Sequence, residues 1–326
     1  MNNLYPLKFE PILKDKIWGG SRLRTVLNKS NASDKCGESW EISAVEGNIS
    51  VVSNGFLAGN NLQELIEVYM GDLVGDKIYD QFGIEFPLLI KFIDANDSLS
   101  IQVHPDDEMA RRRHNAYGKT EMWHIVEANE GAELISGFNK ELTKEIYLDH
   151  LKNKTLREIL NFEKVQAGDV FFMPAGRVHA IGPGILLAEI QQTSDVTYRI
   201  YDWDRVDDQG KSRELHTDMA LDAIDFKHYN KYRTDYETEL NFTTNLADCN
   251  YFTTGLVYFN QPVEKDYNFI DSFVIYMCLE GSFDFVSDQV KPMTIHAGES
   301  VLIPAVLKNV ELIPDGTTRA LEVYIR

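Results

Sequence analysis

Four polar side chains of this chain are of the types that bind a divalent metal ion. Gln102 and His104 lie two residues apart in an apolar, strand-like segment. Side chains two residues apart in a strand share one face of the sheet, so an amide oxygen and an imidazole are presented together. Glu121 and His179 offer a carboxylate and a second imidazole further along the chain. Two histidines and a carboxylate are typical of catalytic zinc, and Fe(II) accepts the same set.

Ligands that come from separate strands converge only on a rigid β scaffold, and the pattern of the chain predicts one. Short apolar segments alternate with turn residues at residues 39–43, 86–93, 99–103, 122–126, 170–173 and 320–325. Short strands at close spacing, separated by glycine and proline turns, favour a jelly roll. We predict helices at residues 61–70 and 106–114, and a helical insertion at residues 140–163.

One pattern occurs twice. Residues 168–175 (GDVFFMPA) and 298–305 (GESVLIPA) both run glycine, acidic residue, apolar strand and Pro-Ala. Such a repeat indicates two copies of one barrel. His179 follows the first glycine by eleven residues, and Asn309 stands at that position in the second copy. The second copy therefore lacks the histidine, and we expect no metal there.

The predicted organisation is thus a mainly β chain with two jelly-roll barrels and a small helical insertion. Residues 1–240 form the predicted metal-binding catalytic domain, with its insertion near residues 140–163. Residues 241–326 form the predicted second domain, without metal.

Composition limits the classes of partner. The 326 residues include 51 acidic and 32 basic side chains, a formal net charge of −19, which disfavours binding to a phosphate backbone. The three cysteines are widely spaced and favour a reducing compartment. No basic and then apolar leader opens the sequence, and no apolar run approaches the roughly 20 residues that span a bilayer. We expect a cytoplasmic protein without nucleic-acid or membrane partners, either monomer or dimer.

The chain resembles the type I mannose-6-phosphate isomerases, a family of zinc-dependent cupin enzymes, in their short bacterial form. The matching segments are residues 11–20 (PILKDKIWGG), 99–106 (LSIQVHPD), 118–123 (GKTEMW), 174–180 (PAGRVHA) and 189–203 (EIQQTSDVTYRIYDW). The resemblance runs from near residue 8 to about residue 220, and more weakly to the end. It implies two cupin-type barrels and one Zn²⁺ per chain, held by Gln102, His104, Glu121 and His179.

The resemblance also implies roles for residues around the metal. Arg199 corresponds to the active-site arginine of the family. The other residues that correspond to its substrate pocket are Trp18, Ser100, Lys119 and Glu189. Many relatives carry an aromatic residue two positions after the last histidine ligand, where this chain has Ile181.

The activity implied by the resemblance is an aldose–ketose isomerisation between mannose 6-phosphate and fructose 6-phosphate. A proton must leave the carbon next to the carbonyl and return to its neighbour, through an enediol or enediolate. Glu189 and Lys119 are the candidates for the base. Arg199 or Lys119 could stabilise the oxyanion or hold the phosphate. Two alternatives stay open: another metal cupin, such as an iron(II) dioxygenase, and a non-catalytic sugar-binding cupin.

Overall fold

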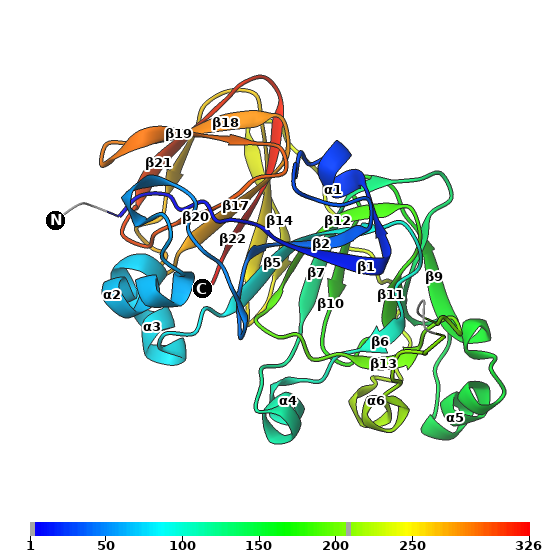
Figure 1. The fold of residues 1–326 in the computed structure, drawn as a ribbon. Helices are drawn as coiled ribbons and strands as arrows, with labels where there is room; N and C mark the ends of the chain where they lie inside the picture. Colours follow the sequence, from blue (N-terminus) through cyan, green and yellow to red (C-terminus); the bar gives the residue numbers. More distant parts are fainter. Residues whose placement is uncertain (1–3, 207–209) are drawn as a thin grey trace.

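The computed structural model describes residues 4–206 and 210–326, so the first three residues of the chain and residues 207–209 lie outside the described part. Its strands form two pairs of sheets, seen at the upper left and the lower right of Figure 1. The first pair has a six-stranded sheet of order β1-β2-β5-β12-β7-β10 and a five-stranded sheet of order β13-β6-β11-β8-β9.

The strands of the six-stranded sheet are β1 (Ile12–Gly20), β2 (Cys36–Ile42), β5 (Leu88–Ala95), β12 (Ile185–Gln192), β7 (Glu121–Ala128) and β10 (Val170–Met173). Those of the five-stranded sheet are β13 (Tyr198–Tyr201), β6 (Ile101–Val103), β11 (His179–Ile181), β8 (Glu133–Phe138) and β9 (Leu160–Lys164). A short ribbon of β3 (Ala44–Val45) and β4 (Asn48–Ile49) stands apart.

The second pair of sheets is built from the C-terminal residues. Its five-stranded sheet contains β14 (Phe242–Asp248), β15 (Thr253–Phe259), β22 (Thr318–Tyr324), β17 (Val274–Glu280) and β20 (Ser300–Ile303). Its four-stranded sheet contains β16 (Val263–Asp266), β21 (Asn309–Pro314), β18 (Ser282–Ser287) and β19 (Val290–His296). The prediction of a mainly β fold with two jelly-roll units is confirmed.

The helices are short and few. They are α1 (Arg22–Thr25), α2 (Leu62–Val74), α3 (Asp76–Phe82), α4 (Asp107–His114), α5 (Lys144–Lys152) and α6 (Thr217–Ala223), with 3-10 turns η1 (Gly55–Leu57) and η2 (Leu156–Glu158). Apolar residues of α5, η2 and α6 pack with Ile101, Ile135 and Tyr198 into a core on the outer face of the five-stranded sheet of the first pair. In Figure 1, α4, α5 and α6 line this side of the molecule.

Two predicted helical segments differ from the structure in detail. The helix predicted to end near residue 70 continues to Val74 after a break at Met70, whose φ is 46°. The predicted insertion at residues 140–163 contains α5 and η2, but its last residues belong to β9. Phe162 pairs there with Ile135 of β8, so this segment completes the edge of a sheet. Its apolar side chains gain more by packing on that core than a solvated helix would provide.

The two pairs of sheets pack back to back. Alternate residues of β12 face opposite ways: Leu187 packs inside the first pair, whereas Leu186 and Ile190 join a second core that also contains Ile275 and Leu321 of the C-terminal strands. Residues from the start of the chain also bind the second pair, because Leu7 and Leu302 exchange both backbone hydrogen bonds. The domain boundary near residue 240 stays a prediction. No helix within residues 4–206 and 210–326 is long and apolar enough to cross a membrane.

Candidate metal centre and catalytic cavity

Three of the four predicted ligands meet inside the first pair of sheets. Nε2 of His104 lies 3.3 Å from Oε1 of Glu121, and Nε2 of His179 lies 3.6 Å from Oε2 of the same carboxylate. One ligand atom from each residue can be chosen so that all three lie within 4.8 Å of one another. All three side chains are buried. Neither oxygen of Glu121 meets the geometry of a hydrogen bond with a described residue, although Oε1 lies 3.0 Å from Nζ of Lys119, so the carboxylate remains suited to a divalent ion.

The backbone fixes how the two imidazoles are presented. Nδ1 of His104 lies 2.9 Å from the carbonyl oxygen of Val196, and Nδ1 of His179 lies 2.8 Å from that of Arg177. A carbonyl only accepts, so Nδ1 carries the proton and donates in both rings. Each Nε2 is therefore unprotonated, and its lone pair lies on the side of Glu121. A hydrogen bond from the other ring nitrogen to a backbone carbonyl is typical of histidines that bind metals.

Gln102 stands at the edge of this cluster. Its strand β6 pairs with β11 so that Gln102 is opposite His179, and its Nε2 lies 3.3 Å from Nε2 of that histidine. Its Oε1 faces the hydroxyl of Ser100 at 3.4 Å. A half turn of the amide presents the oxygen to the cluster instead. The predicted pairing of Gln102 with the metal-type residues on one face is therefore consistent with the geometry.

Burial and the neighbouring cation tune these groups for metal binding. Burial, reinforced by the charge of Lys119, lowers the pKa of His104 to about 3, and burial lowers the pKa of His179. Burial by itself would raise the pKa of Glu121, but Lys119, whose Nζ is 3.0 Å from Oε1, and the two histidines hold it well below the usual range. At neutral pH the set is therefore two neutral imidazoles and one carboxylate, the forms that bind metal.

A cavity of about 430 Å³ opens next to the cluster. The residues predicted around the metal that line it are Trp18, Ser100, Gln102, Lys119, Glu189 and Arg199. Ile181, two positions after His179, also lines it. The structure thus brings together the whole predicted set, although the role of each residue stays a prediction.

Strand alternation brings Arg199 to this cavity. Tyr198 is buried in the outer core under the helices, whereas Thr197 and Arg199 line the cavity. Nη1 of Arg199 donates to the carbonyl oxygen of Glu214 at 2.9 Å, which anchors the side chain. Its Nε is buried without a partner among the described residues and is free to bind a ligand.

The cavity also holds cations that the sequence reasoning missed. Lys91 and Glu189 form a buried ion pair of 3.0 Å, and Nε1 of Trp123 donates to the other oxygen of Glu189 at 2.8 Å. Burial raises the pKa of Glu189, helped by the charge of Glu121 and opposed by Lys91. The available signal was a single lysine inside the otherwise apolar run of residues 86–93.

Further missed residues lie on the two edge strands at the mouth. Lys14 and Lys16 of β1 and Trp40 of β2 line the cavity. Glu38 binds Lys16 at 3.0 Å and accepts from Nε1 of Trp40 at 2.6 Å. Burial opposes the effect, but the charges of Lys91 and Lys16 lower the pKa of Glu38 to about 2. Residues 14, 16 and 18 share a face of their strand, as do 38 and 40, which is the signal that spacing offered.

The second pair of sheets keeps one part of this arrangement. Phe171 pairs with Trp123 and Trp123 with Glu189 in the first pair, and Val301 pairs with Tyr276 and Tyr276 with Glu322 in the second. The hydroxyl of Tyr276 donates to Glu322 at 2.9 Å, as the indole donates to Glu189. Asn309, at the place of His179, is exposed and its Oδ1 accepts from Asn268. The register therefore extends the repeat beyond its sequence signal.

Comparison with known proteins agrees with this geometry. Residues 6–145 match the family model described as "Phosphomannose isomerase type I, catalytic domain". The chain is 41% identical over 256 residues to the mannose-6-phosphate isomerase ManA of Bacillus subtilis, which covers 77% of this chain and 78% of that one. It is 42% identical over 226 residues to a mannose-6-phosphate isomerase of Streptococcus mutans, with 67% of each chain covered.

A solved structure extends the likeness to the whole chain. The crystal structure of a mannose 6-phosphate isomerase from Bacillus subtilis matches with a TM-score of 0.88 and 32% identity, over 99% of this chain and 100% of that one. The match includes the C-terminal sheets, where the sequence resemblance is weaker. On the identity to ManA, the family model and this fold, the chain belongs to the type I phosphomannose isomerase family.

Proposed function

We propose that the chain is a metal-dependent aldose–ketose isomerase that interconverts mannose 6-phosphate and fructose 6-phosphate, with Zn²⁺ as its resident ion. The observation that carries the proposal is one cavity in which the His104, Glu121 and His179 cluster adjoins several cations and a buried carboxylate. The relatives that bear this activity in their names support the substrate assignment.

The metal, held by His104, Glu121, His179 and an inward-turned Gln102, would polarise the oxygens on the two reacting carbons. The other contributions come from the protein. Lys14 and Arg199, which form no ion pair with a described carboxylate, give the cavity the positive charge that a phosphate dianion requires, whereas Lys16 is paired with Glu38. Arg199 additionally offers an unpaired Nε, with the fork geometry that suits an oxyanion or a phosphate.

We assign the proton transfer between the two carbons to Glu189. Its carboxyl lines the cavity, and burial raises its pKa, which makes it a stronger base than a solvated glutamate. Trp123 holds it in place through a hydrogen bond to one oxygen, and Lys91 through an ion pair with the other. Lys119 is the competing base, but its Nζ lies within 3.4 Å of both Glu121 and His104, where its charge supports the ligand set.

The activity test is a coupled assay for fructose 6-phosphate formation after treatment with a chelator. We expect the loss of all measurable activity on metal removal and its return on adding Zn²⁺. Restoration only by Fe(II), together with oxygen uptake, would instead support the dioxygenase alternative. No activity on either hexose phosphate with one equivalent of metal bound would exclude the proposal.

The base assignment has a separate test. Glu189→Gln keeps the volume of the side chain and should lower kcat by about 10²–10⁴ while the metal stays bound. Exchange of the substrate C2 proton with D₂O, followed by NMR, should slow by the same factor. Normal exchange in this variant, with loss of exchange in Lys119→Met, would transfer the role to Lys119.

A further inference from the structure

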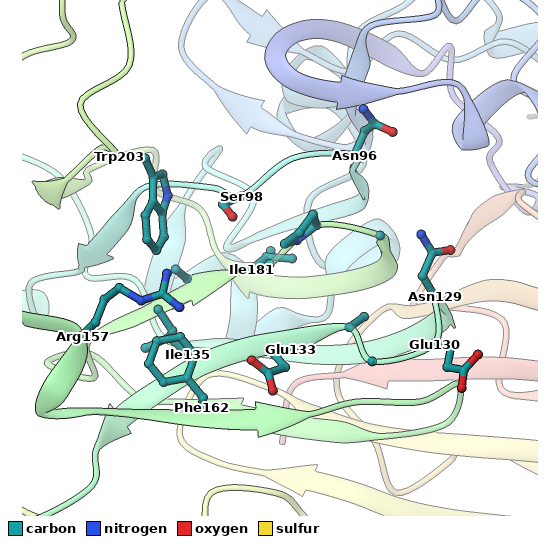
Figure 2. A pocket seen from close by; sticks show the side chains of 16 residues that line it. Asn96, Ser98, Asn129, Glu130, Glu133, Ile135, Arg157, Phe162, Ile181 and Trp203 are labelled. Carbon is teal, nitrogen blue, oxygen red and sulfur yellow. The ribbon is translucent and has the colours of Figure 1, made fainter.

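A second cavity, of about 460 Å³, lies on the opposite face of the sheet that carries the metal-type residues. In β11, His179 points to the cluster, whereas Ala180 packs on the outer face and lines this second cavity. The helices that cover the outer face leave this part of it open. Figure 2 shows the resulting hollow between Trp203 and Arg157 at one end and Asn96, Asn129 and Glu130 at the other.

One end of the cavity joins aromatic rings to an unpaired cation. The guanidinium of Arg157 lies 5.0 Å from the ring centroid of Phe162 and 5.5 Å from that of Trp203. Within the described residues Arg157 has no hydrogen-bond acceptor and no acidic partner, although the chain carries 51 acidic side chains. A guanidinium that is oriented by rings but not neutralised is suited to bind an anion.

The backbone holds the larger ring at this end. Trp203 has a φ of 59°, a left-handed conformation that a bulky residue rarely adopts. Its Nε1 donates to the carbonyl oxygen of Leu99 at 2.7 Å, so the indole is fixed in orientation. Strained residues of this kind are found where the surrounding structure holds a side chain for a function. The indole face offers a flat apolar surface to a ligand.

The rest of the lining mixes small and apolar residues with a few polar side chains. Glu133 lies between the two ends in Figure 2, and Asn96 lies at the far end. Neither side chain has a hydrogen-bond partner in the described part of the chain. A carboxylate and an amide are suited to ring hydroxyl groups, and aromatic faces are suited to the apolar face of a pyranose. The volume is also in the range of sites for small ligands.

We propose that this cavity is a second small-molecule site that binds the phosphorylated ring form of a hexose. The phosphate binds Arg157, the pyranose ring lies on Trp203, and the hydroxyl groups reach Glu133 and Asn96. Of the two acidic residues that line the cavity, Glu130 lies at the other end and Glu133 lies between the ends, so the phosphate is placed at the end that Arg157 and Trp203 form. The proposal concerns binding and does not depend on the isomerase activity.

The test uses α-mannose 1-phosphate, whose ring cannot open and which therefore cannot isomerise. Calorimetric titration of the metal-loaded protein should show a site that survives in Arg199→Lys but weakens at least tenfold in Arg157→Gln. Loss of one charge-assisted hydrogen bond accounts for a change of this size. Arg157 is exposed, so the fold should persist, and Arg112→Gln, an exposed arginine on α4, is the matched control.

Three outcomes would overturn the proposal. Equal affinity in Arg157→Gln and the parent protein would place the ligand elsewhere. Loss of binding in Arg199→Lys alone would place it in the catalytic cavity. If inorganic phosphate bound as tightly as the sugar phosphate, the ring would play no part in recognition. If methyl α-mannopyranoside did so, the phosphate would play none.

Discussion

The properties of single residues in the site follow from burial and from one or two close charges. Lys119 lies within 3.4 Å of both Glu121 and His104, and its charge acts on both. Burial lowers the pKa of His104 and Lys119 adds to this effect, whereas Lys119 opposes burial at Glu121 and lowers the pKa of that carboxyl. The same cation therefore favours the form of each side chain that a metal requires. Residues such as Arg199 act next to this set and can be altered without removing a ligand.

Arg199→Lys is expected to keep the fold and the metal but to lower kcat by about 10²–10³, because a lysine lacks the planar fork of donors. The coupled assay, metal analysis and circular dichroism together check this. Arg112→Lys on α4 should leave all three unchanged. A rise of KM alone would place Arg199 at the phosphate, and normal kinetics with metal bound would remove it from the site.

The buried pair of Lys91 and Glu189 makes a second prediction at this scale. Lys91→Met leaves a buried carboxylate without its cation and should lower the free energy of unfolding by about 3–5 kcal/mol. Adding Glu189→Gln removes the unpaired charge and should restore much of the loss. Urea unfolding of both singles and the double variant measures the coupling between the two residues.

An exposed pair provides the contrast for that cycle. Arg326→Met breaks the ion pair between Arg326 and Asp248, whose two side chains are 61% and 43% exposed, respectively. The change should lower the free energy of unfolding by no more than about 1 kcal/mol. Additive effects of the Lys91 and Glu189 changes would mean that the two charges do not depend on each other in the fold.

Elements of the fold place side chains by alternation and by close backbone contact. The repeated segments begin at Gly168 and Gly298, and both glycines have positive φ, 91° and 86°. They differ in their surroundings. A Cβ at Gly298 would lie 2.3 Å from the carbonyl oxygen of Leu27, whereas one at Gly168 would meet only the hydroxyl of Tyr236, at 3.5 Å. The second repeat is therefore held more tightly by the N-terminal part of the chain.

This difference predicts unequal effects of the same substitution. Gly168→Ala should lower the free energy of unfolding by about 1–2 kcal/mol, because alanine disfavours the positive φ of this position. In Gly298→Ala the new Cβ would also clash with the backbone of Leu27, so the free energy of unfolding should fall by about 1–3 kcal/mol more than in Gly168→Ala. Thermal or urea unfolding of the two variants measures the difference. Equal losses would show that the N-terminal segment moves away at no cost.

At the scale of the whole molecule, one buried histidine, His124 of β7, links the stability of the fold to pH. His124 has the opposite strand parity to Glu121 and does not join the cluster of His104, Glu121 and His179. It is buried, and neither ring nitrogen has a partner in the described part of the chain. Burial, with a smaller effect of the positive charge of Arg319, lowers the pKa of His124 to about 4 from an ordinary 6.5.

This shift predicts how stability depends on pH. Between pH 6.5 and pH 4 the unfolded chain binds a proton at His124 that the folded protein excludes, so the free energy of unfolding falls as the pH falls through this window. The full loss is about 3 kcal/mol. His124→Phe removes this contribution and should be less sensitive to acid than the parent protein.

Urea unfolding at pH 7, 6 and 5 of both proteins gives the comparison, since all other titrating groups are shared. His296→Gln changes an exposed histidine and serves as the control. Parallel pH profiles for His124→Phe and the parent protein would contradict the buried neutral state of His124.

The sequence by itself determined whatever depends on local spacing. Two residues of separation put Gln102 and His104 on one face, and alternation put Arg199 into the cavity while Tyr198 went to the outer core. The repeat at residues 168–175 and 298–305 indicated two related units. The family motifs named the set that the structure gathers around one cavity.

The tertiary structure decided what depends on pairing between distant segments. Lys91 becomes the partner of Glu189 only because β5 pairs with β12 in the register that places them side by side. Phe162 joins a strand, not a helix, because β8 offers it an edge. The second cavity lies behind the strand that carries His179 because the helices cover only part of that face. Such contacts join residues tens of positions apart, so no local pattern records them.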